Sequence, residues 1–286
     1  MGDKTSIEWT DATWNPVRGC SRVSPGCGGP NHQGGCYAEK IAARFSDQGH
    51  PFHGFAERTE HGGRWTGTLA LVDELLDLPL RWKKPRRIFV NSMSDLFHEN
   101  LKDHEIGAVF EVMRDANWHT FQVLTKRADR MREWVSSRNA KNWPMWIGKW
   151  LLPNVWLGVS VEDQARKDRI EELRRTSAAI RFLSLEPLLE DLGELKLGGI
   201  SLAIIGGESG PNSRPFDLAW PRNIIRQCKA AGTACFMKQL GARPVETPLR
   251  SDHNYRRPLK LRDRKGSDSS EWPEDLRVRE FPNAQG

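Results

Sequence analysis

A regular alternation of short apolar runs with longer polar or amphipathic stretches constrains the fold most. Each run holds a short block of apolar or β-branched residues, which is typical of a strand buried on both faces. The stretches between the runs combine one apolar stripe with one charged face, as surface helices do. Strands that alternate with helices predict βαβ units and a parallel sheet. The runs lie at 81–95 (core 88–90), 120–127, 154–163, 180–188, 201–210 and 233–241.

A seventh strand is expected at 12–17, just before a loop that is rich in cysteine, glycine and proline. Seven strands favour an α/β fold with a partial or open (β/α) barrel over a doubly wound sheet. The length of 286 residues suits one such domain. We therefore expect a barrel over 1–244 that contains the cysteine loop at 14–45. The charged tail at 245–286 is expected to cap this barrel.

Composition narrows the class of protein. The formal net charge of +6 is compatible with a polyanionic partner such as nucleic acid, although solubility alone explains it equally well. No apolar run reaches the roughly 18 residues of a membrane helix, and the N-terminus has no apolar signal region. The sequence thus predicts a cytoplasmic protein without a membrane partner. With no export signal, the five cysteines are expected to be metal ligands, redox groups or buried thiols rather than disulfides.

Three of the cysteines, Cys20, Cys27 and Cys36, share the loop and are separated by six and then eight residues. Free thiols prefer apolar cores, so this glycine- and proline-rich setting disfavours three buried thiols. An iron–sulfur cluster held by three thiolates would keep one iron open for a substrate or cofactor. The loop precedes a helix at the mouth of the predicted barrel, which favours such a catalytic cluster. Cys228 and Cys235 are expected to pack in the core.

Zinc is the alternative metal for this loop. A structural zinc site would need a fourth ligand beside the three cysteines. Candidates for that ligand are His32, His50 and His53.

Polar side chains follow each apolar run, where the chemistry of parallel α/β folds collects. Taken singly, they have structural explanations, since Ser and Asp cap helices and paired glycines make tight turns. As a set they are expected to converge on one functional mouth. The set is Ser92, Ser94, Asp95, Lys126, Ser160, Glu162, Glu186, Gly206, Gly207, Glu208 and Lys238.

Several motifs carry a resemblance to a known family. They are "WNPVRGCSRVSPGC", "FVNSMSDLFHE", "LTKR", "WLGVSVE", "LSLEPLL", "GGESGP", "MKQLG" and "DRKGSDSSEWPEDLRVREFP". Over nearly its whole length the chain resembles a family of unknown function that is associated with phages and mobile elements. That family is usually regarded as similar to the radical S-adenosylmethionine enzymes. The cysteine triplet followed by the aromatic Tyr37 fits this likeness, although both gaps between cysteines are longer than that superfamily's usual spacing.

The resemblance implies a [4Fe–4S] cluster on Cys20, Cys27 and Cys36 that chelates the amino and carboxylate groups of S-adenosylmethionine. An external one-electron donor would reduce the cluster, and cleavage of the sulfonium would yield a 5′-deoxyadenosyl radical. In such enzymes the cofactor carries the reaction, and the protein binds, orients and excludes water. The phage-type likeness and the basic charge point to a nucleic acid or nucleotide as the substrate, for modification or repair.

The resemblance also suggests roles for the residues at the strand ends. Ser92, Ser94 and Asp95 would hold the methionine amino group, and Ser160 and Glu162 would meet the ribose or carboxylate. Gly206 and Gly207 would line the cofactor site, while Lys126, Glu186, Glu208 and Lys238 would face the substrate.

Two alternatives involve no radical chemistry. One is a zinc-stabilised nucleic-acid-binding barrel. The other is a metal-dependent hydrolase that uses Asp95, Glu162 or Glu208.

Overall fold

The computed structural model describes residues 5–29, 34–137, 146–147, 150–247 and 257–282. Its main sheet has seven strands in the order β1-β6-β7-β10-β11-β12-β14. This confirms the predicted α/β class and the partial, open (β/α) barrel of seven strands. The seven strands are Ala12–Trp14, Arg87–Val90, Thr120–Thr125, Val155–Ser160, Ile180–Leu185, Leu202–Gly206 and Ala234–Gln239.

The chain forms two compact units. The first unit comprises residues 1–24, 36–159 and 172–181, and the second comprises 25–35, 160–171 and 182–286. The cysteine loop is divided between the two units. Residues 25–35 belong to the second unit, and the parts of the loop before and after them belong to the first.

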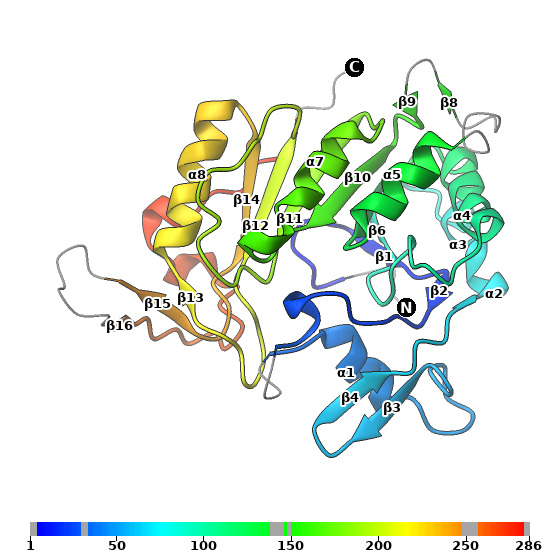
Figure 1. Ribbon diagram of the computed structural model, residues 1–286, viewed down its shortest axis with the longest axis horizontal. Helices are drawn as coiled ribbons and strands as arrows, with labels where there is room; N and C mark the ends of the chain where they lie inside the picture. Colours follow the sequence, from blue (N-terminus) through cyan, green and yellow to red (C-terminus); the bar gives the residue numbers. More distant parts are fainter. Residues whose placement is uncertain (1–4, 30–33, 138–145, 148–149, 248–256, 283–286) are drawn as a thin grey trace. The chain divides into compact units, whose positions relative to one another are not determined.

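In the first unit, β1, β6, β7 and β10 pair in parallel, with Trp14 beside Val90 and Val90 beside Val123. Its helices are α1 (Tyr37–Arg44), α2 (Asp73–Leu76), α3 (Leu78–Arg81), α4 (Asp103–Asp115) and α5 (Ala128–Ser136), drawn from blue to green in Figure 1. Helix α4 starts with a capping interaction in which Glu105 Oε2 accepts the Lys102 amide at 2.7 Å. Helix α7 (Asp168–Arg175) spans the boundary between the units.

The first unit also holds small antiparallel pairs. They are β2 (Val17–Arg18) with β5 (Ala70–Leu71), β3 (Ala56–Thr59) with β4 (Gly62–Trp65), and β8 (Trp146–Ile147) with β9 (Trp150–Leu151). The β3–β4 hairpin packs on α1 around a small core that includes Ala42 and Trp65. Cys20 and Cys36 are partly buried against this same core. The hairpin was not expected from the sequence, where this region looked only rich in turns.

In the second unit, β11, β12 and β14 pair in parallel. Helix α8 (Ala219–Ala231) packs on β14 and ends at Gly232, whose φ of 69° is the left-handed conformation that glycine adopts most readily. A three-stranded sheet joins β13 (Phe216–Asp217), β15 (Pro244–Glu246) and β16 (Arg257–Pro258). Short 3-10 helices are η1 (Pro25–Cys27), η3 (Gln164–Arg166), η4 (Ser269–Glu271) and η5 (Glu274–Leu276).

The C-terminal tail packs along β14. The Met237 amide donates to the Val278 carbonyl, and the Glu280 amide donates to the Cys235 carbonyl, both at 2.8 Å. Trp272 is 2% exposed, and its indole Nε1 donates to the Gly266 carbonyl at 3.1 Å. The tail therefore covers one edge of the parallel strands with a buried aromatic anchor.

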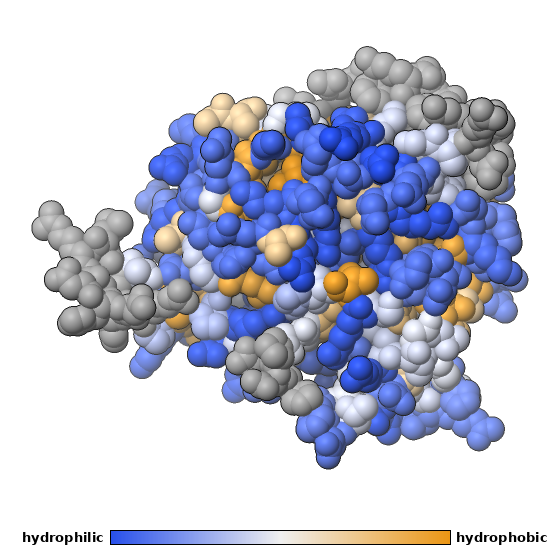
Figure 2. Space-filling model, in the orientation of Figure 1, coloured by the Kyte–Doolittle hydropathy of each residue, from blue (hydrophilic) through white to orange (hydrophobic). Residues whose placement is uncertain are grey.

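Hydrophilic side chains dominate the face drawn in Figure 2, and hydrophobic ones lie in scattered patches. Among the described residues, every helix is too short or too polar to cross a bilayer.

Replacing Trp272 with Ala tests how much the tail anchor stabilises the protein. Loss of a buried Trp side chain is expected to lower the free energy of unfolding by about 3–5 kcal/mol. Urea unfolding measures this, with Glu274→Ala, an exposed neighbour, as the control that should change it by less than about 0.5 kcal/mol. A decrease below about 1 kcal/mol for Trp272→Ala would contradict an anchoring role.

Candidate functional site

The cysteine loop is the candidate functional site. Its three thiols are partly buried, and none of them forms a disulfide in the described parts of the chain. Cys20 and Cys36 belong to the first unit, whereas Cys27 ends η1 in the second. Cys228 on α8 and Cys235 on β14 are buried in the core, as the sequence predicted.

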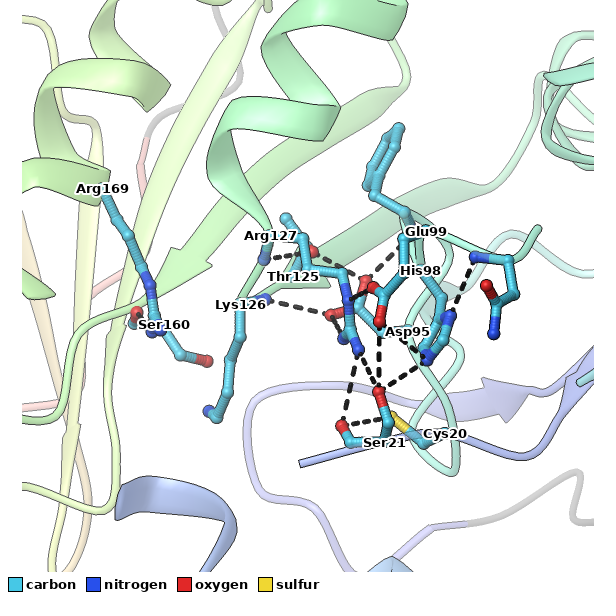
Figure 3. Close-up of polar contacts among 12 residues, drawn as sticks. Cys20, Ser21, Asp95, His98, Glu99, Thr125, Lys126, Arg127, Ser160 and Arg169 are labelled. Carbon is cyan, nitrogen blue, oxygen red and sulfur yellow. Dashed lines mark hydrogen bonds and ion pairs between the residues drawn. The ribbon is translucent and has the colours of Figure 1, made fainter. Parts of the chain in front are cut away.

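In the first unit, Asp95 ties the end of β6 to the end of β7 (Figure 3). Its carboxylate is 6% exposed. It accepts hydrogen bonds from the Thr125 hydroxyl at 2.7 Å, from the Phe97 amide at 3.0 Å, and from the Lys126 amide at 3.1 Å. A fourth donor is Arg127 Nη1, at 3.1 Å. These contacts give Asp95 a positioning role, and the cofactor contact predicted for it stays a prediction.

Arg127 links Asp95 to the residue that follows Cys20. Its guanidinium is 7% exposed, and Nη2 donates to the Ser21 hydroxyl at 2.8 Å while Nε donates to Glu99 Oε2 at 2.5 Å. Burial alone lowers the pKa of Arg127, but the negative charges of Asp95 and Glu99, with a further contribution from the nearby Cys20, outweigh it and raise the pKa. The Cys20 thiol and Arg127 Nη2 share the Ser21 carbonyl as acceptor, at 3.5 and 3.4 Å. A cation is therefore fixed beside Cys20.

His98 completes this network. Its ring is 1% exposed, and Nδ1 accepts the Asn100 amide at 3.1 Å. In the neutral ring the proton then lies on Nε2, which is 2.8 Å from the Ser21 hydroxyl and donates to it. Burial, followed by the charge of Arg127, lowers the pKa of His98 and favours this neutral form. Both His98 and Arg127 thus hold Ser21.

The other predicted residues of the first unit lie around the same strand end. The Ser94 hydroxyl donates to the Val17 carbonyl at 3.0 Å, and the Ser92 hydroxyl donates to Asn15 Oδ1 at 3.1 Å. The Tyr37 hydroxyl, next to Cys36, donates to the Ser92 carbonyl at 2.5 Å. Lys126 differs from them, because among the described residues its ammonium has no partner, and Figure 3 shows it pointing away from the Asp95 network.

A further carboxylate, Glu39 on α1, holds the loop just after Cys20. Glu39 is 1% exposed. It forms an ion pair with Arg22 at 2.5 Å and accepts the Trp65 amide at 2.9 Å. The Arg22–Glu39 ion pair fixes the loop to α1, and the hydrogen bond from the Trp65 amide joins both to the β3–β4 hairpin.

In the second unit, Glu162 fixes Gly26, near the start of the loop segment 25–35. Glu162 is fully buried and accepts the Gly26 amide at 3.3 Å and Arg169 Nη1 at 3.0 Å. A Cβ at Gly26 would lie 3.0 Å from Glu162 Oε1, so the glycine allows this close approach. Arg169 also donates to the Ser160 carbonyl at 2.8 Å, which fixes the end of β10.

Glu208 holds the other end of the same segment. It is 6% exposed, accepts the Gly35 amide at 3.1 Å, and forms an ion pair with Arg214 at 2.7 Å. Arg214 in turn donates to the Pro25 carbonyl at 2.8 Å. Gly34 has a φ of 63°, and a Cβ there would lie 2.1 Å from Glu208 Oε1, so only glycine fits.

The surroundings of Glu208 favour the ionised form of its carboxyl group. Burial alone raises the pKa of this carboxyl group. The hydrogen bonds from the side chain and amide of Arg214, with a smaller contribution from the Gly35 amide, outweigh burial and hold the pKa below its ordinary value.

The remaining predicted residues lie together at the ends of β11, β12 and β14. Lys238 and Glu186 form an ion pair at 2.6 Å and are 15% and 17% exposed. A Cβ at Gly206 would lie 3.2 Å from the Glu186 carboxyl carbon, and one at Gly207 would lie 2.4 Å from the Leu240 carbonyl oxygen. Both glycines thus serve close packing at the strand ends. Their predicted part in binding a cofactor stays untested.

The predicted residues therefore form two groups. Ser92, Ser94, Asp95, Lys126, Cys20 and Cys36 lie in the first unit, and Ser160, Glu162, Glu186, Gly206, Gly207, Glu208, Lys238 and Cys27 lie in the second. Within the described parts of the chain, no group of three or more His, Cys, Asp or Glu side chains is arranged to hold a metal ion. His32 lies outside the described residues, and His53 Nδ1 is 3.2 Å from the Ser46 carbonyl oxygen.

Sequence reasoning missed two carboxylates, Glu39 and Glu99, and three arginines that pair with carboxylates, Arg22, Arg169 and Arg214. One signal was available: a carboxylate at the end of a buried strand needs a partner, and an Arg follows both Glu162 and Glu208 within seven residues.

A comparison with protein-family models matches residues 4–271 to the family described as "Protein of unknown function (DUF5131)". The chain belongs to this family. Comparisons with curated proteins and with solved structures gave no match. The match covers the cysteine loop, all seven strands of the main sheet and most of the tail of this family member.

Replacing Arg127 with Met tests the network beside Cys20. The change leaves the carboxylate of Asp95 buried without its cation and should lower the free energy of unfolding by about 3–5 kcal/mol. The matched control is Arg130→Met, which removes a more exposed pair with Asp103 and should cost about 0–1 kcal/mol. Equal decreases in the two variants, measured by urea unfolding, would contradict the central place of Arg127.

The pH dependence of stability tests the anchor at Glu208. Since folding lowers the pKa of Glu208, its contribution is complete above the unfolded value of about 4.5 and is lost as the pH falls through the lower folded value. Glu208→Gln should therefore be less stable than the wild type at pH 7, and the gap should narrow below pH about 4.5. The exposed Glu194→Gln serves as the control. A gap that stays constant from pH about 7 to 3 would refute this linkage.

Proposed function

We propose that the protein is an iron–sulfur enzyme of the radical S-adenosylmethionine type, with a [4Fe–4S] cluster held by Cys20, Cys27 and Cys36. The observation that carries the proposal is a loop with three partly buried thiols outside any disulfide, whose segments are fixed by buried carboxylates. The sequence motifs resemble a family of unknown function that is usually regarded as similar to radical S-adenosylmethionine enzymes, and this supports the same interpretation.

The residue types of the loop suit the chemistry of the proposed cluster. Three thiolates are the donor set that leaves one iron of a four-iron cluster open. Arg127 lies beside Cys20, where a cation favours the thiolate form.

When bound, the cluster supplies the electron that cleaves the sulfonium of S-adenosylmethionine. The protein's own residues position the loop and exclude water. The Asp95–Arg127 network holds the segment that carries Cys20, and Glu162 and Glu208 hold the segment that carries Cys27. Lys126 and the Glu186–Lys238 pair are the groups that we assign to the substrate, because their charged ends are not engaged in holding the loop.

We further propose a nucleic acid or nucleotide as the substrate, in keeping with the net charge of +6. The reaction would need an external one-electron reductant. We also propose the cytoplasm as its compartment, because cysteines outside disulfides suit a reducing environment.

Anaerobic purification tests the proposal. The wild type should carry iron and sulfide, show a brown absorption near about 400 nm, and release 5′-deoxyadenosine when dithionite and S-adenosylmethionine are added. Cys27→Ala should lose the colour and the product, because one of three ligands is gone.

The matched control is Cys228→Ala, which removes a thiol from the core and should keep the iron. Colourless wild-type protein with stoichiometric zinc would overturn the proposal and favour the zinc-stabilised alternative.

A further inference from the structure

Helix α1 exposes its largest apolar side chains to solvent. Tyr37, Ile41 and the C-cap residue Phe45 follow one another at a spacing of four residues, which places them along one face of the helix. Their exposed fractions are 49%, 37% and 49%. The opposite face packs on the β3–β4 hairpin (Figure 1) and consists of Ala38, Glu39, Ala42 and Ala43.

We call Tyr37, Ile41 and Phe45 the α1 stripe. Among the described residues, six large apolar side chains are exposed, and the stripe contains three of them. Single exposed apolar side chains are ordinary on a protein surface, whereas a contiguous set marks an interaction site. The stripe is such a set, because its members are neighbours on one helix. The other three exposed side chains are Val23, Leu80 and Trp118.

The stripe begins directly after a proposed ligand of the cluster. Cys36 is the N-cap of α1, and its carbonyl accepts the Lys40 amide at 3.2 Å. The Tyr37 hydroxyl donates to the Ser92 carbonyl at 2.5 Å, which fixes the first ring of the stripe. At about 1.5 Å of rise per residue, Phe45 lies at most about 14 Å along the helix from Cys36. A protein bound to the stripe would therefore lie close to Cys36.

The chain around the stripe is basic. Residues 18–46 contain four Lys or Arg residues and one acidic residue, Glu39, whose carboxylate is buried. Arg44 is exposed and lies on the same face of α1 as the stripe. The next acidic residue, Asp47, is paired with Arg58 at 2.8 Å. A partner with negative surface charge is therefore favoured, because like charges that meet across an interface are costly.

We propose that the α1 stripe is the docking surface for a small acidic protein that carries one electron on a flavin or an iron–sulfur centre. The inference rests on the proposed function, which requires an external one-electron reductant, and it gives that reductant a binding site. One electron leaves the carrier, which is oxidised, and enters the cluster, which is reduced. No bond forms or breaks, and no proton moves.

The size and composition of the stripe suit this partner. Interfaces of electron-transfer proteins are small and transient, so the exposed face of one short helix can provide the centre of such a contact. Aromatic and arginine side chains are enriched in interfaces, and the stripe with Arg44 offers both kinds. The rate of electron transfer falls steeply with distance, so a site that begins beside Cys36 is favourable for delivery of an electron to the cluster.

Titration calorimetry of the full chain with two acidic carriers, an FMN-loaded flavodoxin and a [2Fe–2S] ferredoxin, tests the surface. Ile41→Asp removes apolar contact and adds a like charge, so it should bind both carriers on the order of tenfold more weakly than the wild type. Ile41→Lys loses the same contact without repulsion and should weaken binding less. The matched control, Leu80→Asp on α3, changes a side chain that is 39% exposed and should bind like the wild type.

The charge of Arg44 gives a second test of the same surface. Arg44→Glu should weaken binding of the flavodoxin and flatten the decrease of affinity with rising salt, because an attraction that salt screens has been removed. The same titration at several salt concentrations measures this. An unchanged salt dependence would contradict the part assigned to charge.

Electron delivery separates docking from the reaction itself. Dithionite is small and needs no docking surface, so Ile41→Asp should keep the wild-type iron content and the wild-type release of 5′-deoxyadenosine with dithionite. With limiting reduced flavodoxin as the donor, its release should be on the order of tenfold slower. Cys27→Ala should bind the flavodoxin like the wild type, because the surface of α1 is intact without the cluster.

The inference fails if neither carrier binds the wild type, if Ile41→Asp and Leu80→Asp weaken binding equally, or if basic cytochrome c binds as tightly as the flavodoxin. It also fails if sedimentation shows a wild-type dimer that Ile41→Asp dissociates, because the stripe would then join two copies of the chain. Stripe-dependent binding by a wild type without iron would refute the proposed function and leave the docking surface standing. Iron and dithionite-driven product without stripe-dependent binding would refute only this surface.

Discussion

The structure of the cysteine loop depends on buried carboxylates that are each paired with an arginine. Asp95 with Arg127 and Glu39 with Arg22 hold the loop ends in the first unit. Glu162 with Arg169 and Glu208 with Arg214 hold its middle in the second. Each carboxylate also accepts at least one backbone amide. Without these four ion pairs, a segment this rich in glycine would have little to hold it in one conformation.

Buried ion pairs are costly to form and contribute little net stability, but removal of one partner is strongly destabilising. In this protein the buried ion pairs therefore fix the geometry of the loop more than they raise the free energy of unfolding. Arginine suits this task because its planar fork can bind a carboxylate and a second acceptor at once, as Arg127 and Arg214 do. The chain thereby links thiol-bearing segments to the carboxyl ends of its strands, where α/β folds hold their chemistry.

The sequence predicted the strands of the main sheet well, because buried parallel strands leave short apolar runs that are visible without tertiary information. It also placed Asp95, Glu162 and Glu208 at strand ends. It could not show that these carboxylates hold the loop, since their partners are set by tertiary contacts such as that between Arg214 and Pro25. Glu39 was missed because a Glu in the first turn of α1 is an ordinary helix residue. The β3–β4 hairpin was missed because its strands are short and mostly exposed.

The central claim is that this anchored loop holds iron through its three cysteines. X-ray absorption at the iron and zinc edges of anaerobically purified protein tests it most directly, because the method reports the ligands of the metal itself. The account predicts an iron signal with sulfur neighbours and iron–iron scattering, as a four-iron cluster gives. A zinc signal with sulfur and nitrogen neighbours at tetrahedral distances, and no iron, would contradict it.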